Sequence, residues 1–493
     1  MPATVPITAF SGAAPPWSLL ALDANFTAIQ SALANPQIGI SVTADSGGVN
    51  ALIATPTPAW TSYVSGTPIT VTPANTNTGN VTLNVSGLGT RSVLNPDGSQ
   101  LLPGALQAGT PYLFMCGTST FVLLGSSLVQ ATQGPGGTPF ALRNRLINGD
   151  FHVDQRYIGT SAALNNVGVT YTVDRWASAC ALGVGTGSLS VQKVTTNGAA
   201  MGNPYGLTFT VGTPKAVLAA TDACFLRQAV EGLNIADLYF GSAGAKSITV
   251  SFTFQTSYAN ATLPIAIVNG TPNRSYVTSI TTGAINTPAR YSVTIPGDTT
   301  GTWAIDPSLG MLVIFSFAMG SNFQGTANTW QAGQFQTVSG ATNFMATGGA
   351  TWQITDIQLE AGSVATPFER IGFDMQYQRC MRYFERSYDY GTQTGTPTVN
   401  GCWYTYVSNL GSGAQQLVVT VPYKVPKRVG GYVLHLYSTT SGSIDTVRDT
   451  ISAVDRASAV PSAGMYGYQN QTQGAAAQTF YGMQWHWTAD AEL

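Results

Sequence analysis

The chain has 493 residues, of which only 9% are charged, whereas an ordinary soluble protein has about 25%. Its formal net charge is −2 and its isoelectric point is near 5.9, which excludes the basic surface of a nucleic-acid-binding protein. A mean hydropathy of +0.11, with no apolar run of about 18 residues, excludes insertion into a membrane through a spanning helix. The missing charges are replaced by Gly, Ser, Thr, Asn and Gln, and this composition predicts a mainly β protein.

The first 36 residues carry the clearest helical pattern of the chain. Apolar residues recur at spacings of three and four, as in a coiled-coil seam of two short heptads, at Leu19, Leu22, Phe26, Ile29 and Leu33. A helix this short is marginal in water by itself, so we expect it to pack on identical helices or on a docking protein, or alternatively on its own chain. Residues 1–5 lack the charged and apolar regions that begin a secretory signal.

Period-two patterns begin at about residue 37 and predict a small β-domain over 37–126. Strands are expected at 69–72, 81–85, 112–115 and 120–124. Glycine-containing segments between these strands supply the turns. Residues 127–142 include the run Gln-Gly-Pro-Gly-Gly, so we expect a linker there.

The largest predicted unit spans residues 143–372. Alternating polar and apolar residues mark expected strands at 246–254, 291–295, 311–315 and 351–359. Many short strands with hardly any helix indicate a β-sandwich of the jelly-roll type.

A connector helix is predicted over 373–390, because Phe373, Tyr377 and Phe384 share one helical face. Residues 391–493 return to strand patterns, which predict a C-terminal β tip domain.

The five cysteines stand singly, with no CxxC pair and no clustered histidines, at Cys116, Cys180, Cys224, Cys380 and Cys402. This spacing indicates neither a zinc site nor a disulfide framework. We therefore expect buried or free thiols.

Motifs for catalysis are mostly missing from the sequence. It contains no GxSxG elbow, no HExxH motif and no Walker loop, and its three histidines lie far apart. The glycine cluster at 183–187 lacks the spacing of a nucleotide-binding loop, so we expect a hairpin. Glycoside hydrolysis by two facing carboxylates is the catalytic option left open. The acids that could supply such a pair are Asp150, Asp154, Asp174, Asp298, Asp306, Asp356, Glu360 and Glu369.

Acids near both ends of the large unit could meet on neighbouring strands of a jelly roll. Residues 144–151 open the unit and residues 354–362 nearly close it. Their side-chain oxygens could bind a hard cation such as Ca2+, with Asn148, Asp150, Asp356 and Glu360 as candidate ligands. Alternatively, these acids cap loops or pair with Arg145, Arg175 and Arg370.

Several motifs of the large unit carry a family resemblance. They are RLINGDF at 145–151, YTVDRW at 171–176, QAVEGLN at 228–234, PGDTTGTW at 296–303, QLEAG at 358–362 and PFER at 367–370. With the ending CMRYF at 380–384, their order and spacing resemble the carbohydrate-binding-module-like domain of bacteriophage tail fibres. The resemblance implies a jelly roll, a fold that in such modules often holds a structural calcium ion.

The flanking regions agree with this resemblance. Residues 50–56, 75–79 and 81–89 are similar to a small domain common near the N-termini of phage fibres, and residues 488–493 are similar to the end of many fibre proteins. The resemblance implies an elongated homotrimer, anchored through residues 1–36 to tail or baseplate proteins. It also implies a virion protein that is made in the host cytoplasm and released by lysis.

Adsorption to a bacterial surface polysaccharide, without enzymatic cleavage, is the function that the resemblance implies. The expected sugar contacts are the aromatic residues Trp176, Trp303, Trp330 and Trp352, with Arg175 and Asn328 as polar neighbours. Alternatively, each of these aromatic residues fills the core. Two other functions stay open: an architectural baseplate or capsid fibre without a receptor role, and a polysaccharide depolymerase.

Overall fold

The computed structural model describes residues 41–96, 98–101, 103–124, 143–183, 186–195, 201–408, 416–473 and 480–493. The predicted anchor helix over 1–36, with its seam of Leu19, Leu22, Phe26, Ile29 and Leu33, and the predicted linker lie outside these ranges. The chain divides into two compact units, Met1–Gly137 and Thr138–Leu493, which are described separately. In the described part, no helix is long and apolar enough to cross a membrane.

The described residues of the first unit form a sheet with the strand order β1-β3-β6-β7-β5-β4-β2. Its strands are β1 (Ser41–Ala44), β2 (Ala51–Ala54), β3 (Pro68–Thr72), β4 (Thr82–Val85), β5 (Thr90–Leu94), β6 (Tyr112–Cys116) and β7 (Phe121–Leu123). Alternate residues point inward, so Leu83, Phe114 and Phe121 are fully buried. The four strands predicted here are confirmed as β3, β4, β6 and β7.

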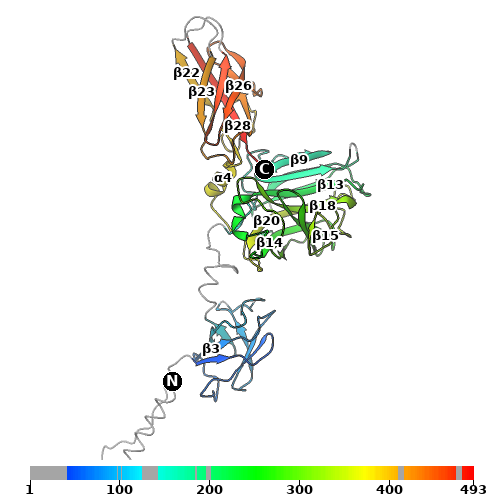
Figure 1. Cartoon of the computed structure of the whole chain (residues 1–493), viewed down its shortest axis with the longest axis vertical. Coiled ribbons are helices and arrows are strands. Elements are labelled where there is room, and N and C mark those ends of the chain that lie inside the picture. The colour runs from blue at the N-terminus through cyan, green and yellow to red at the C-terminus, as the bar shows by residue number, and fades with distance from the viewer. Residues whose placement is uncertain are drawn as a thin grey trace, which may run out of the picture. The chain divides into compact units, whose positions relative to one another are not determined.

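The second unit begins with a β-sandwich of two sheets, drawn in cyan to yellow in Figure 1. The first sheet has the order β19-β16-β15-β18-β13-β10-β9 and the second has the order β17-β14-β20-β12-β11-β8. Their strands are β8 (Ala162–Leu164), β9 (Val167–Val173), β10 (Trp176–Ala181), β11 (Leu189–Thr195), β12 (Tyr205–Val211), β13 (Ala223–Glu231), β14 (Ile248–Thr256), β15 (Thr262–Asn269), β16 (Arg274–Thr281), β17 (Ala289–Ile295), β18 (Leu309–Met319), β19 (Trp330–Ala332) and β20 (Thr351–Ala361).

Large aromatic side chains from both sheets fill the space between them. Trp176 and Phe315 come from the first sheet, and Phe209, Phe252 and Trp352 come from the second. Strand β18 is apolar along nearly its whole length because residues packed on its outer side bury that face too. The predicted mainly β fold with a jelly-roll-like sandwich is therefore confirmed.

A disulfide joins Cys180 of β10 to Cys224 of β13. The two cysteines are 44 residues apart in sequence, but the antiparallel register of these strands places them directly opposite each other. The prediction of free thiols is wrong for this pair, because register is not visible in cysteine spacing. Within the described ranges, Cys116, Cys380 and Cys402 are free.

The predicted connector helix is shorter than expected. Helix α4 (Phe373–Met381) ends well before residue 390, and β21 (Phe384–Arg386) pairs with the last strand, β28 (Phe480–Asp490). The prediction of a helix over 373–390 is wrong in its second half. Glu385 lies in β21, where its carboxylate is fully buried against Lys427, and this tertiary pairing overrides the helical periodicity.

The remaining strands form a C-terminal β-domain, drawn in orange and red in Figure 1. They are β22 (Trp403–Ser408), β23 (Gln416–Pro422), β24 (Val433–Ser438), β25 (Thr446–Asp449), β26 (Val454–Ala463) and β27 (Gly467–Gln473). Strand β28 is central: β22 and β25 lie on its opposite edges, because both pair with Met483 and Gln484. Met483, Trp485 and Trp487 point from β28 into the core of this domain.

Candidate functional site

The outer face of the seven-stranded sandwich sheet carries a row of residues that crosses six strands. The register of neighbouring strands places them opposite one another in the order Tyr171, Ala177, Arg227, Ile314, Ala266 and Val277. Directly opposed residues project to the same side of a sheet. Their sequence neighbours, such as Trp176 and Leu226, point into the sandwich core.

Part of this outer face is covered by the chain itself. Phe323, Phe335 and Val338, from the segment after β18, pack against Ile314 and the other apolar residues beside it. Strand β9 is less covered, because Val169 is 45% exposed and Tyr171 is only partly buried, whereas on β13 Arg227 reaches the surface between Phe225 and Ala229, which are 8% and 2% exposed. The accessible part of the face is therefore the end that contains Arg227.

Arg227 has no polar partner within the part of the chain that the structure describes. Its guanidinium carbon lies 5.7 Å from the ring centroid of Phe225, two residues earlier on β13, and Ala177 lies opposite on β10. Burial lowers the pKa of Arg227, and the neighbouring Tyr171 acts in the opposite direction. The guanidinium is partly desolvated and has no polar partner among the described residues, while its nitrogens are not among the buried atoms that lack a partner, which makes Arg227 a candidate ligand contact.

Carboxylates are missing from the described rows of this face. The row containing Phe225 adds Ala179 and Ser316, and the next row contains Ala229, Leu312, Val268 and Ser275. A glycosidase of the usual kind needs two carboxylates that face each other across the scissile bond. The geometry around Arg227 therefore offers hydrogen-bond donors and apolar contacts, but no acid pair in these rows.

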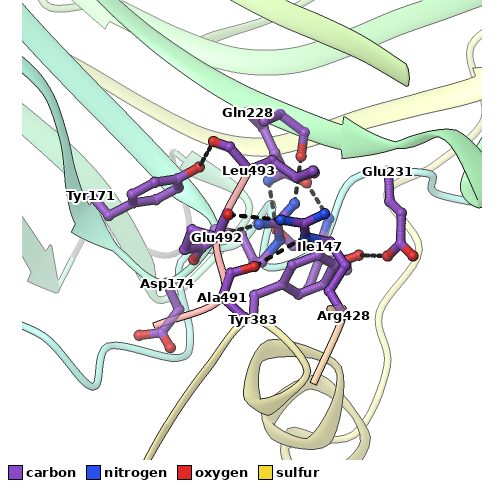
Figure 2. Close-up of polar contacts among 12 residues, drawn as sticks. Ile147, Tyr171, Asp174, Gln228, Glu231, Tyr383, Arg428, Ala491, Glu492 and Leu493 are labelled. Carbon is purple, nitrogen blue, oxygen red and sulfur yellow. Dashed lines mark hydrogen bonds and ion pairs between the residues drawn. The ribbon is translucent and has the colours of Figure 1, made fainter. Parts of the chain in front are cut away.

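The last residues of the chain contact Tyr171 and the charged residues near it. The Tyr171 hydroxyl donates a hydrogen bond to the main-chain oxygen of Leu493 at 2.8 Å, and the side chain of Leu493 packs on the apolar outer face (Figure 2). The preceding Glu492 pairs with the buried guanidinium of Arg175. Arg156 binds Glu492 and Asp490 as well, at 3.3 and 2.7 Å.

Asp174 lies beside this charge network and is completely buried (Figure 2). Burial raises its pKa to about 6, although Arg156 and hydrogen bonds from Gln155 act in the opposite direction. The main-chain N–H and the side-chain amide of Gln155 both donate to the carboxylate at 2.6 Å. Asp174 thus has a structural role next to the site, as part of a buried hydrogen-bond network.

The structure places most of the predicted sugar contacts in the core. Trp176, Trp303 and Trp352 are 0%, 7% and 1% exposed, and Arg175 is 1% exposed. The prediction is wrong for these four residues, because a side chain sealed in a core cannot stack on a ligand in solvent. Their aromatic rings supply the largest apolar surfaces of the sandwich, which explains their burial.

The other two predicted contacts, Trp330 and Asn328, lie nearer the surface. Trp330 is partly buried against Trp303, with ring centroids 5.6 Å apart, and its indole N–H donates to the Pro296 carbonyl. Asn328 is exposed, and its side-chain oxygen accepts a hydrogen bond from Thr278. The structure therefore joins Trp303 and Trp330 in one aromatic group away from Arg227.

The candidate calcium ligands do not form a cation site. Both ends of the Asn148 amide bind main-chain atoms of Val153, and Glu360 accepts hydrogen bonds from Thr366. Asp356 accepts a hydrogen bond from Asn203, and Asp150 accepts one from the main-chain N–H of His152. No group of three or more acidic, histidine or cysteine side chains suited to a metal occurs among the described residues. The predicted ligand set is corrected accordingly, because these side chains bind the protein itself.

Sequence reasoning missed Tyr171, Phe225 and Arg227. The visible signal was a single arginine at an outward position of the otherwise largely apolar segment 223–230. Which of the alternating positions faced outward depended on strand pairing, so the signal could not be interpreted without the register.

Comparisons with known proteins give matches to solved structures only. No family model matches, and no curated protein matches. The enzymatically active domain of tailspike protein 4 from bacteriophage CBA120 is 10% identical, with a TM-score of 0.22 and coverage of 44% of this chain and 21% of that chain. A family 61 carbohydrate-binding module in complex with β-1,4-galactotriose is 12% identical, with a TM-score of 0.22 and coverage of 44% and 99%. The family 11 module from Clostridium thermocellum is 13% identical, with a TM-score of 0.21 and coverage of 42% and 98%.

Proposed function

We propose that this chain is a bacteriophage fibre protein that binds a bacterial surface polysaccharide without cleaving it. The observation that carries the proposal is the guanidinium of Arg227, which has no polar partner among the described residues, lies beside Phe225 and is partly exposed, as is Tyr171 on the same sheet face. The fibre motifs at 145–151 and 171–176 support the virion assignment by resemblance.

Arg227 can act as a hydrogen-bond donor that is already partly desolvated. Its planar guanidinium can donate two parallel hydrogen bonds to adjacent oxygens of a sugar. The buried ring of Phe225 lies next to the guanidinium, and the partly buried ring of Tyr171 on the same face offers apolar surface against which the C–H groups of a sugar can pack. Because no described protein group occupies the guanidinium nitrogens and they are not buried, these donors are free to bind a ligand.

Glycan binding by the full chain tests this function. The wild-type chain and the Arg227→Met variant are applied to an array of purified bacterial surface polysaccharides. We expect the wild type to bind at least one polysaccharide and Arg227→Met to lose about tenfold in affinity for it, since methionine keeps the bulk and removes the donors. Equal binding by the two proteins would remove Arg227 from the site.

A matched control is available on the opposite sheet. Arg290 of β17 donates to the Ser251 hydroxyl at 2.8 Å and does not lie on the outer face of the β13 sheet. Arg290→Met therefore changes the same chemical group elsewhere, and we expect unchanged glycan binding. A wild-type chain that binds no polysaccharide and whose removal leaves phage adsorption intact would favour an architectural fibre instead.

The seam at Leu19, Leu22 and Phe26 supports the further proposal of a homotrimer. Three chains in one fibre would convert weak sugar contacts into stable attachment through multivalency. Light scattering of the full chain is then expected to give three times the chain mass of 51.5 kDa. A monomer at micromolar concentration would contradict the trimer.

A further inference from the structure

A second row of side chains crosses the C-terminal β-domain from strand to strand. Tyr404 of β22 lies opposite Gln484 of β28, and Gln484 lies opposite Arg448 of β25. Arg448 in turn lies opposite Asp455 of β26. Because opposed residues share a face and neighbouring strands lie about 4.8 Å apart, the four residues form a row about 14 Å long.

Exposed tyrosines form the β22 end of this row. Tyr404 and Tyr406 are 51% and 52% exposed, and two positions apart on one strand they share a face. Tyr404 lies against Gly482 of β28, where a methyl group would come within 3.2 Å of the tyrosine hydroxyl. Because Gly482 has no side chain, the Tyr404 ring can pack directly on the β28 backbone.

Two polar groups of the row are available to a ligand. The amide nitrogen of Gln484 and the hydroxyl of Tyr404 make no hydrogen bond with any residue that the structure describes. The amide oxygen of Gln484 accepts only a long hydrogen bond, 3.4 Å, from Thr439. The amide donor of Gln484 thus lies next to the exposed ring and hydroxyl of Tyr404.

The charges of the row are compensated within the domain. Arg448 lies 3.3 Å from Asp455, and the Ser441 hydroxyl donates to the same carboxylate. Nearby, Arg456 lies 2.8 Å from Asp449. The surface therefore has hydrogen-bonding capacity without an excess of either charge, so it lacks the cationic groups that would select an acidic polymer.

We propose that the row Tyr404–Gln484–Arg448–Asp455 is a second binding surface, specific for a neutral saccharide. The Tyr404 ring offers an apolar face to the C–H side of a sugar, while Gln484 and the Arg448–Asp455 pair meet its hydroxyls. This surface lies on the C-terminal β-domain and uses no residue of the Arg227 face. It therefore goes beyond the function proposed for the sandwich and can be tested independently.

The test uses the full chain and defined probes. Hexasaccharides of glucose, galactose and mannose are titrated and followed by saturation-transfer NMR. We expect at least one of them to bind and Tyr404→Ala to weaken its binding about tenfold. Tyr466→Ala is the control, because Tyr466 is 74% exposed between β26 and β27 but lies outside the row, so its loss is expected to change nothing.

Three results with the neutral probes would overturn the inference. They are no binding of any neutral probe, full binding by Tyr404→Ala, and equal losses in Tyr404→Ala and Tyr466→Ala. Arg227→Met separates the two proposals: if it abolishes neutral-saccharide binding that Tyr404→Ala leaves intact, the sandwich site stands and this inference fails. Binding that depends on Tyr404 and not on Arg227 supports this inference and leaves the sandwich site to be tested by the polysaccharide array.

A second variant tests whether the pairing of Arg448 with Asp455 is what makes the surface prefer neutral saccharides. Asp455→Asn leaves the Arg448 cation without its carboxylate, so we expect the variant to gain binding to oligogalacturonate, an acidic probe. A wild-type chain that already binds oligogalacturonate through Tyr404 more tightly than every neutral hexasaccharide would show that the neutral class is wrong.

Discussion

The carboxylate of Glu492 pairs with the guanidinium of Arg175 at the junction between the sandwich and the end of β28, where the two side chains are 4% and 1% exposed. Arg428, which comes from the C-terminal β-domain, donates to the main-chain oxygens of Ala491 and Glu492. Opposite charges buried this deeply stabilise a junction only when both are present, because an isolated buried charge is costly.

Removing one partner of this pair should destabilise the chain strongly. For Glu492→Gln we expect the free energy of unfolding of the second unit to fall by about 3–5 kcal/mol, measured by denaturant titration. Asp445→Asn is the control, because Asp445 is 58% exposed in its pair with His435, and such surface pairs contribute about 1 kcal/mol or less. Similar losses in both variants would contradict the structural role of Glu492.

The Arg227→Met variant should show the opposite change in the free energy of unfolding. Because its guanidinium has no partner in the described structure, Arg227→Met is expected to raise the free energy of unfolding by about 1 kcal/mol. Arg290→Met loses the hydrogen bond to Ser251 and should lower it by about 1 kcal/mol. A loss in Arg227→Met as large as that in Arg290→Met would indicate a structural role for Arg227 instead of a binding role.

The buried carboxyl of Asp174 predicts a dependence of stability on pH. Burial raises its folded-state pKa to about 6 from an ordinary value of 3.8, so between these values the folded state binds more protons than the unfolded state. The contribution of Asp174 to stability is therefore present below pH 3.8 and is lost as pH rises to about 6. The free energy of unfolding of the wild type, minus that of Asp174→Asn, should fall by roughly 2–3 kcal/mol across this window. A constant difference would show that the carboxyl is not perturbed.

The disulfide predicts a specific thiol count. The denatured, unreduced chain should react with three equivalents of a thiol reagent, from Cys116, Cys380 and Cys402, and the reduced chain with five. Cys224→Ala should give four, because Cys180 is then released, and should lower the free energy of unfolding by about 2–4 kcal/mol. Five equivalents from the unreduced wild type would show that the bond does not form.

Alternation along individual strands was readable from the sequence because it depends on neighbours in the chain. It predicted the strands at 69–72 and 311–315 and the sandwich as a whole. The low charge content and the net charge of −2 excluded the basic surface of a nucleic-acid-binding protein. The helix predicted through Phe384 was wrong because a strand pairing with β28, distant in sequence, competes with local periodicity.

Most residues of the candidate sites could not be predicted from the sequence. Which face of a strand meets solvent depends on register, and a shift of one residue exchanges the two faces. Composition and periodicity therefore determined that this is a mainly β protein with low charge and many aromatic residues. Only the tertiary structure decided that Trp176 and Trp352 fill the core while Arg227 is partly exposed and Tyr404 is exposed, because burial depends on contacts between strands far apart in the chain.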